Sequence, residues 1–263
     1  MPFPIRAATT LAGMACALAL ALGTMLGSSG TLAEELSTAK TSEADAERFF
    51  DALVKVRTRA VPNARSAATL GQEREGTGIV IGEDGLILTI GYLIVEADEV
   101  QVVDGHGHAL PAQVAGYDHA TGFGLVRTTI PLKVPPLALG DSAKLSLRDP
   151  VLVVNYDGVS DVTLAFVVSK RPFTGNWEYL LDQAIFTSPP VTNWSGAALV
   201  SRDLKLVGVG SLIVREATEG EPKLPGNVFV PIDLLKPILA DLVKDGHRAG
   251  PAQIGRASCK ERV

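Results

Sequence analysis

Ser195 lies in the stretch VTNWSGAALV (residues 191–200), in a Trp-Ser-Gly turn that directly precedes an apolar run. A serine hydroxyl is a weak nucleophile until a neighbouring base, usually histidine, accepts its proton, and that histidine needs a carboxylate to hold it in the right tautomer. Whether Ser195 acts as a nucleophile therefore depends on which side chains the fold brings to it.

Short runs of β-branched and aliphatic residues dominate the chain from Gly76 onward. Turn residues separate these runs, with Glu83-Asp84-Gly85 and Asp104-Gly105 as the first two predicted hairpin turns. The spacing predicts an all-β fold of two six-stranded halves, residues 76–130 and 131–246, joined by the Pro-rich segment PLKVPPLALGD. Two regions show helical spacing instead. They are FFDALVKVRTRAVP, in a predicted N-terminal helical arm over residues 34–75, and IDLLKPILADLVKDG, a predicted C-terminal helix that Gly246 ends.

The two ends of the chain differ from its middle. Arg6, the apolar run from Leu11 to Leu26 and the small residues up to Ala33 predict an export signal over residues 1–33, with an uncleaved membrane anchor as the alternative. The basic tail, residues 247–263, differs so much from what precedes it that we treat it as a possibly non-native end. Cys16 and Cys259 lie in these two ends, so the predicted folded part has no cysteine for a disulfide or metal site.

Several motifs in one order resemble the HtrA (DegP-type) branch of the chymotrypsin-like serine proteases. They are TGIVIGEDGLILT, ADEVQVV, GYDHATGFGLVR, PPLALGDSAKL, VTLAFVVSK and FVPIDLLKPILADLVKDG, and they run through most of residues 76–246. The resemblance implies two perpendicular antiparallel β-barrels with the active site in the cleft between them.

The resemblance also implies where the catalytic residues should lie, and two of them are missing. Relatives carry the histidine in a Leu-Thr-Asn-Asn-His type stretch, where this chain has LTIGYLIVEADE with Tyr92 at the histidine position. They carry the carboxylate in a Thr-Asp-Leu-Ala-Leu type strand, where this chain has TGFGLV with Gly122 at the acid position. A phenol, with a reference pKa of about 10, is a poor base at neutral pH. Only Ser195 keeps its residue type.

The surroundings of Ser195 depart from the pattern as well. Asn193 takes the place of a glycine whose amide, with that of Ser195, is expected to form the oxyanion hole. The strand VGVGSLIV corresponds to the one that lines the substrate pocket in relatives, so Gly208, Gly210 and Ser211 are the predicted pocket residues, suited to small or medium apolar side chains.

Other groups offer weaker candidates for the missing base. His119 precedes the Gly122 position by three residues and is the one histidine that we consider as a substitute base. His106 and His108 flank a glycine in a predicted turn and have no third ligand beside them, so we predict no metal. We also predict no organic cofactor. The net charge of -5, with both signs interspersed, argues against a nucleic-acid partner.

Three functions remain open at this stage. The first is an exported protease homologue, periplasmic or secreted, that is catalytically impaired and binds peptides, unfolded chains or a partner protein. The second is an active serine endopeptidase that uses Ser195 with an unorthodox base. The third is a structural or assembly module whose cleft is closed by Trp194, Tyr92 and Phe123. Relatives often form trimers through the N-terminal segment, so a homotrimer is possible, with FFDALVKVRTRAV as its candidate interface.

Overall fold

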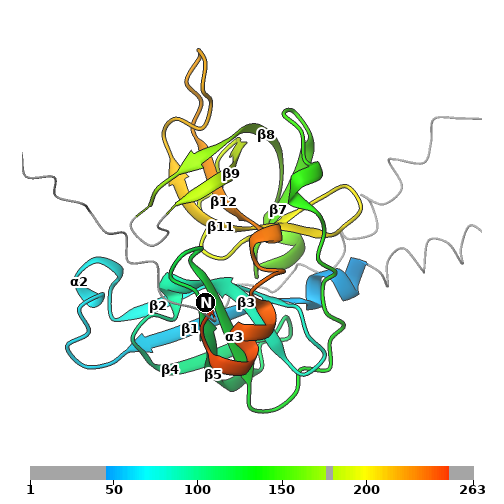
Figure 1. Ribbon diagram of the computed structural model, residues 1–263. Helices are drawn as coiled ribbons and strands as arrows, with labels where there is room; N and C mark the ends of the chain where they lie inside the picture. Colours follow the sequence, from blue (N-terminus) through cyan, green and yellow to red (C-terminus); the bar gives the residue numbers. More distant parts are fainter. Residues whose placement is uncertain (1–45, 176–179, 249–263) are drawn as a thin grey trace, which may run out of the picture. The chain divides into compact units, whose positions relative to one another are not determined.

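Two closed β-barrels make up the fold in the part of the chain that the computed structural model describes, residues 46–175 and 180–248. Both barrels belong to one compact unit and follow each other along the chain (Figure 1). The first has the strand order β1-β2-β3-β6-β5-β4, and the second β10-β11-β12-β9-β8-β7. All the strand pairs within the barrels are antiparallel. The two six-stranded barrels predicted from the sequence are thus confirmed.

The strands have the following bounds. The first barrel consists of β1 (Leu53–Ala60), β2 (Glu73–Val80), β3 (Leu86–Ile90), β4 (Ala97–Val103), β5 (Ala109–Tyr117) and β6 (Phe123–Thr128), and the second of β7 (Pro150–Val154), β8 (Val162–Phe173), β9 (Leu181–Ser188), β10 (Ala198–Val200), β11 (Leu206–Val214) and β12 (Gly226–Pro231). The helical pieces are short: α2 (Ala67–Leu70), α3 (Leu239–Asp245), and the 3-10 turns η1 (Gly91–Leu93), η2 (Ser142–Lys144), η3 (Gly158–Asp161) and η4 (Ile232–Leu234).

The helix predicted over FFDALVKVRTRAVP is wrong for most of its length. Residues 46–51 are helical, but Leu53–Ala60 form β1, so the first barrel begins at Leu53 and not at Gly76. Val54, Val56 and Ala60 point into the barrel core, and the charged residues between them lie on its outer face. Pairing with β2 and β4 on both sides stabilises the strand, and tertiary contacts of this kind override a weak local preference. These apolar side chains are buried within the barrel, so the trimer interface that we predicted for this segment would use its outer-face residues, and it stays a prediction.

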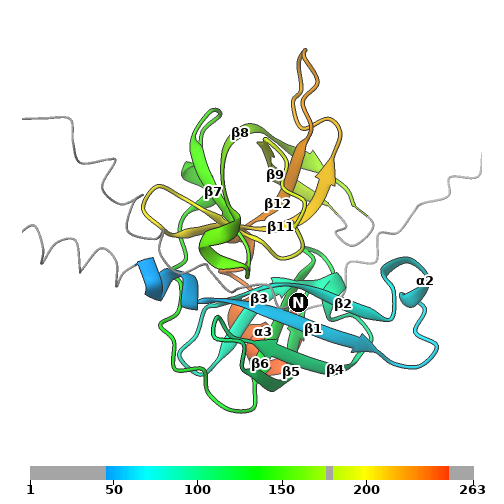
Figure 2. The same cartoon turned by 180° about the vertical axis from the view of Figure 1, so that it is seen from behind.

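The C-terminal helix ends as predicted but begins later. Gly246 adopts the left-handed conformation, with φ 76°, and its amide donates to the Leu242 carbonyl, as a helix C-cap does. Pro237, which has no amide hydrogen, separates η4 from α3. The helix packs back onto the first barrel, where the Tyr117 amide donates to the Gly246 carbonyl (Figures 1 and 2). It therefore belongs in space with residues 53–128 and not with the second barrel.

The predicted signal segment, residues 1–33, and most of the basic tail lie outside the described residues. Of the tail, only His247 and Arg248 are described, and Arg248 forms an ion pair of 2.9 Å with Asp118. Among the described residues, no helix has the length and apolar character needed to cross a membrane.

Candidate active site

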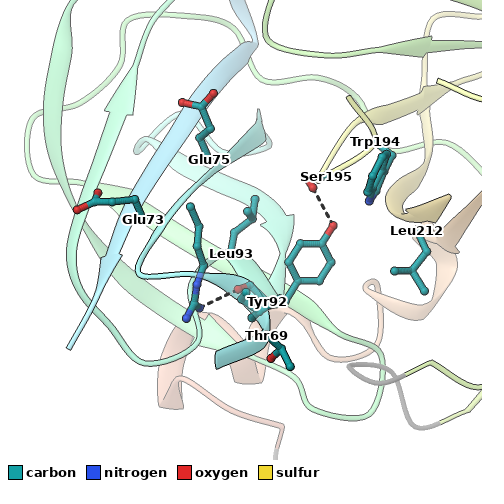
Figure 3. A pocket seen from close by; sticks show the side chains of 10 residues that line it. Thr69, Glu73, Glu75, Tyr92, Leu93, Trp194, Ser195 and Leu212 are labelled. Carbon is teal, nitrogen blue, oxygen red and sulfur yellow. Dashed lines mark hydrogen bonds between the residues drawn. The ribbon is translucent and has the colours of Figure 1, made fainter. Parts of the chain in front are cut away.

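Tyr92 and Ser195 meet between the two barrels. Tyr92 is the middle residue of η1, the turn that follows β3, and the residue is 7% exposed. Its hydroxyl lies 3.0 Å from Ser195 Oγ (Figure 3). It also lies 2.9 Å from the carbonyl oxygen of Ser211. The tyrosine thus holds the position next to the serine where the resemblance places a histidine.

The proton positions in this group follow from its donors and acceptors. A carbonyl oxygen can only accept a hydrogen bond, and a phenol has one proton to donate. The arrangement that satisfies all three groups has Tyr92 donating to the Ser211 carbonyl and accepting from the Ser195 hydroxyl. A phenol oxygen that keeps its own proton does not remove the proton of Ser195, as a general base must.

Gly122 lies in the turn just before β6, beside the turn that holds Tyr92. The Gly91 amide donates to the Gly122 carbonyl over 2.6 Å, so the acid position and the histidine position are neighbours, as the resemblance implies. Gly122 has φ 78°, a conformation that glycine adopts without strain and that other residues, even aspartate, adopt at a cost. An aspartate at this position would therefore carry backbone strain.

The backbone around Ser195 is held by the first barrel. The Thr77 amide donates to the Ser195 carbonyl over 2.8 Å. Gly196 follows with φ 73°, and a Cβ at this position would lie 2.1 Å from the Thr77 carbonyl oxygen. Only glycine fits between Ser195 and β2.

Asn193, at the predicted oxyanion position, is not among the described non-glycine residues with positive φ. Its side-chain amide donates to the carboxylate of Asp161 over 2.8 Å, and the side-chain amide of Asn155 donates to the same carboxylate oxygen. The asparagine side chain is thus hydrogen-bonded to η3, which follows β7. The sequence gives no sign of this contact, because Asp161 resembles any exposed turn residue.

A groove of about 360 Å³ leads to Ser195. It is lined by Thr69, Leu70, Glu73, Arg74, Glu75, Tyr92, Leu93, Trp194, Ser195 and Leu212 (Figure 3). Trp194 and Tyr92 form part of its wall, but Phe123 is fully buried among the core residues and does not line it. An open groove at Ser195 argues against the prediction of a cleft closed by these three aromatic residues.

The three residues of β11 that we predicted as pocket residues do not line the groove. Gly208 faces the second barrel's interior, where a Cβ would lie 3.2 Å from Phe229 Cβ. Gly210 packs against the Trp194 carbonyl, and Ser211 is fully buried with its carbonyl bonded to Tyr92. Leu212, the next residue, is the one in this strand that lines the groove.

Arg74 is a site residue that the sequence analysis missed. Its side chain is buried, and its Nη1 atom donates to the carbonyl oxygens of Tyr92 (3.0 Å) and Val95 (2.7 Å). Its Nη2 atom donates to Ser66 Oγ, which in turn donates to the Glu96 carboxylate. Burial lowers the pKa of Arg74, an effect that the charge of Glu96 partly offsets. A charged residue at an inward position of an alternating strand was the signal that could have found it.

Arg74 joins two walls of the groove. It holds the η1 turn that carries Tyr92, and through Ser66 and the Gly71 carbonyl it also holds the ends of α2. The hydrogen bonds from Ser66 lower the pKa of Glu96, first through its hydroxyl and then through its amide. The position of Tyr92 therefore depends on this buried guanidinium.

The histidines of the described residues lie in other settings. His119 packs edge-on against Tyr117, with ring centroids 4.3 Å apart. His108 contacts Asp104 over 2.9 Å in the predicted hairpin turn, and His106 lies beside it. No group of three or more metal-ligating side chains occurs among the described residues.

Comparison with known proteins identifies the family to which this chain belongs. A family model described as "Trypsin-like peptidase domain" matches residues 76–209, just over half of the chain. The chain therefore belongs to the trypsin-like peptidase family.

Within that family the chain is of HtrA type. It is 29% identical to the serine protease PepD of Mycobacterium tuberculosis, over 76% of this chain and 48% of that protein, and 23% identical to the serine endoprotease DegS of Salmonella typhimurium, over 76% of this chain and 56% of that protein. A structure of the HtrA-type protease AlgW with a tripeptide has the same fold, with a TM-score of 0.61 and 22% identity over 77% of this chain and 64% of that one. The chain thus spans about half the length of these curated relatives.

Proposed function

We propose that this protein is an exported, HtrA-type protease homologue that binds extended peptide segments in the groove at Ser195 and no longer hydrolyses them efficiently. The observation that carries the proposal is the Tyr92 hydroxyl, which hydrogen-bonds to both Ser195 and Ser211 where a histidine base is expected. Gly122 stands where the carboxylate is expected, so both the base and the group that would orient it are replaced.

The chemistry of the family explains why these two changes matter. Loss of the catalytic base from a serine protease costs roughly 10⁴- to 10⁶-fold in turnover, and the residual rate comes from binding and the oxyanion hole. Binding depends on the walls of the groove and not on the base. The groove walls persist here, which supports binding without efficient turnover.

The known relatives support the peptide ligand and the location. AlgW structures are described with a tripeptide and with a decapeptide, and a Rickettsia conorii relative is described as a probable periplasmic endoprotease. The predicted export signal agrees with a periplasmic or secreted protein. Assembly as a homotrimer stays a prediction that sedimentation at micromolar concentration tests.

An active-site-directed fluorophosphonate tests the loss of activity. We expect less than stoichiometric labelling of Ser195, and no hydrolysis of casein between pH 5 and pH 10. The Ser195→Ala variant sets the background for both measurements. Stoichiometric labelling that the variant abolishes, together with casein cleavage, would overturn the proposal.

The same outcome would establish the second candidate, an active serine endopeptidase with an unorthodox base. The observation in its favour is that Ser195 is partly exposed and lines the groove. Its base would have to be a residue that reaches Ser195 when substrate binds or that a neighbouring subunit supplies.

Peptide binding is tested with a fluorescein-labelled decapeptide of aliphatic and basic residues, measured by fluorescence polarisation. We expect the Leu212→Lys variant to weaken binding about tenfold or more, because a charge would enter an apolar wall. Leu164→Lys is the matched control, since Leu164 is 55% exposed on β8 and does not line the groove. Equal losses in both variants would place the ligand elsewhere.

A further inference from the structure

An apolar patch lies on the second barrel at strands β7 and β8, which are neighbours in the sheet (Figures 1 and 2). Eleven large apolar residues are exposed in the part of the chain that the structure describes. Five of them fall in this short region: Leu147, Val159, Val162, Leu164 and Phe166. Single exposed apolar residues are ordinary on a protein surface, but a cluster of them marks a site of interaction.

Strand periodicity shows that the centre of the patch is one continuous face. Ala165 of β8 is buried in the core of the second barrel, so its neighbours Leu164 and Phe166 point outward. Residues opposite each other on neighbouring strands share a face. Leu164 pairs with Leu152 of β7, and Phe166 pairs with Pro150. The register therefore extends the apolar face over both strands.

Only part of this side of the sheet is covered. Val200 of β10 pairs with Leu152 and is fully buried in the apolar core that the two barrels share. Leu164, on the other side of β7, is 55% exposed. Removing apolar surface from water is favourable, so a second body that covered β8 would gain free energy there.

The two ends of the face carry opposite charges. Leu147 and Arg148 precede β7, whereas Asp157 and Val159 follow it, and all four residues are exposed. The carboxylate of Asp149 accepts a hydrogen bond within its own loop. The five residues of β7 separate the two ends by about 17 Å. Each end therefore offers one apolar and one charged side chain, and the charges differ in sign.

This order of groups is complementary to itself. A twofold axis across the strands would turn β7 of a second copy in the opposite direction. Arg148 of each copy would then lie beside Asp157 of the other, and Leu147 beside Val159, each contact occurring twice. A lipid surface has no fixed order of charges over such a distance. A second copy of this chain supplies both the apolar centre and the opposite charges at its ends.

We propose that two copies of this chain associate through the β7–β8 face, antiparallel about a twofold axis, with Leu164 and Phe166 at the centre and Arg148 of each copy beside Asp157 of the other. The inference does not depend on the proposed function, because none of these residues lines the groove at Ser195. It also differs from the predicted homotrimer, since a twofold contact joins two chains or two trimers.

Sedimentation velocity of the full chain at micromolar concentration tests the contact. We expect the wild type to have twice the mass of Leu164→Lys, because a lysine would enter the apolar centre twice. This ratio holds whether the repeating unit is one chain or a trimer. Ile130→Lys is the matched control, since Ile130 is 57% exposed in the segment after β6 of the first barrel, and it should keep the wild-type mass.

Charge reversal tests the antiparallel order. Arg148→Glu and Asp157→Arg should each raise the dissociation constant of the twofold contact at least about tenfold, because two attractive pairs become repulsive. The double variant should return to within about threefold of the wild type, since the exchanged charges again oppose each other. Lys244→Glu is the control, because Lys244 is exposed on α3, which packs on the first barrel.

The outcomes are distinct. Equal masses of the wild type and Leu164→Lys would overturn the proposal. A wild type that does not self-associate but binds phosphatidylcholine vesicles, with binding lost in Leu164→Lys, would overturn it in favour of a lipid surface. If Leu164→Lys halves the mass but the double charge variant stays as weak as the single ones, the antiparallel order is overturned. Peptide binding at the groove should be the same in Leu164→Lys as in the wild type.

Discussion

The Tyr92 hydroxyl of the first barrel lies 3.0 Å from the Ser195 hydroxyl of the second, although the two residues are 103 positions apart in the sequence. The same phenol contacts the Ser211 carbonyl over 2.9 Å. Tyr92 therefore joins the turn that carries Ser195 to β11 by hydrogen bonds that favour the assembled groove.

Tyr92→Phe should lower the free energy of unfolding by about 1–2 kcal/mol, because the buried Ser211 carbonyl loses a donor. Urea denaturation measures this change. Tyr156→Phe is the control, since its hydroxyl makes only a long, exposed contact of 3.4 Å with Glu75, and it should change stability by less than about 0.5 kcal/mol. If Tyr92→Phe also reduced fluorophosphonate labelling below the wild-type level, the phenol would be assisting Ser195.

Tyr92→His should not restore turnover by itself. A histidine without its carboxylate lacks the group that sets its tautomer, and this loss alone costs about 10⁴-fold in a serine protease. Casein hydrolysis should remain undetectable, as we expect for the Tyr92 protein. Adding Gly122→Asp should cost about 1–2 kcal/mol in stability, because aspartate would adopt φ near 78°. A double variant with wild-type stability and rapid turnover would contradict this reading of Gly122.

Arg74→Met should lower the free energy of unfolding by about 3 kcal/mol, because the carbonyl oxygens of Tyr92 and Val95 lose their charged donor. It should also weaken the binding of the groove peptide, since η1 and α2 would no longer be held together. Arg57→Met is the matched control, because the Arg57 side chain is 52% exposed and pairs only loosely with Glu75. Similar losses in both variants would show that Arg74 does not hold the site.

Gly196→Ala should destabilise the protein by more than about 3 kcal/mol, because its Cβ would lie 2.1 Å from the Thr77 carbonyl oxygen in addition to the strain at φ 73°. Gly107→Ala separates the two causes. Gly107 has φ 86° with nothing within 4 Å of a Cβ, so its cost should be the backbone strain of about 1 kcal/mol. Thermal unfolding of the two variants side by side measures the difference.

Acid should weaken the attachment of η2 to the second barrel through Asp233. Burial raises the pKa of this carboxyl, but hydrogen bonds from Lys236, Ser142 and the Ala143 amide outweigh that effect and lower its pKa to about 2. Ionised Asp233 contributes about 1–2 kcal/mol to the free energy of unfolding, after allowance for its partial exposure. This contribution is present above pH 4 and is lost as the pH falls from about 4 to about 2. Urea unfolding at several pH values should show this slope, and Asp233→Asn should flatten it. Asp141→Asn should leave it unchanged.

Local patterns in the sequence were enough to predict most of the strands. The runs after Gly76 alternate between turn residues and β-branched residues, and the hairpins at Gly85 and Asp104 occur where they were expected. The prediction failed at Leu53–Ala60, where the apolar residues fit a helix as well as a strand. Only pairing with β2 and β4, which are distant along the chain, decides between the two.

The site residues also divide into those that motif order identified and those that only the structure identified. Motif order alone singled out Ser195, Tyr92 and Gly122, and the fold brings their turns together. Arg74, Asp161 and Leu212 were not found, because a residue's type and spacing do not say which loop of the other barrel it will contact. Phe123 was placed in the cleft because it is large and near a motif, and the structure buries it in the core instead.

The sequence by itself determined the fold class, the family and the residue types at the former catalytic positions, because these depend on local periodicity and on motifs in a fixed order. The tertiary structure alone decided that the Tyr92 hydroxyl lies between Ser195 and Ser211, that Gly122 adopts φ 78°, and that a groove leads to Ser195. These properties depend on contacts between segments that lie far apart along the chain. They arise only when the two barrels pack, since a hydrogen bond needs its donor and acceptor within about 3 Å and no short stretch of sequence encodes that distance.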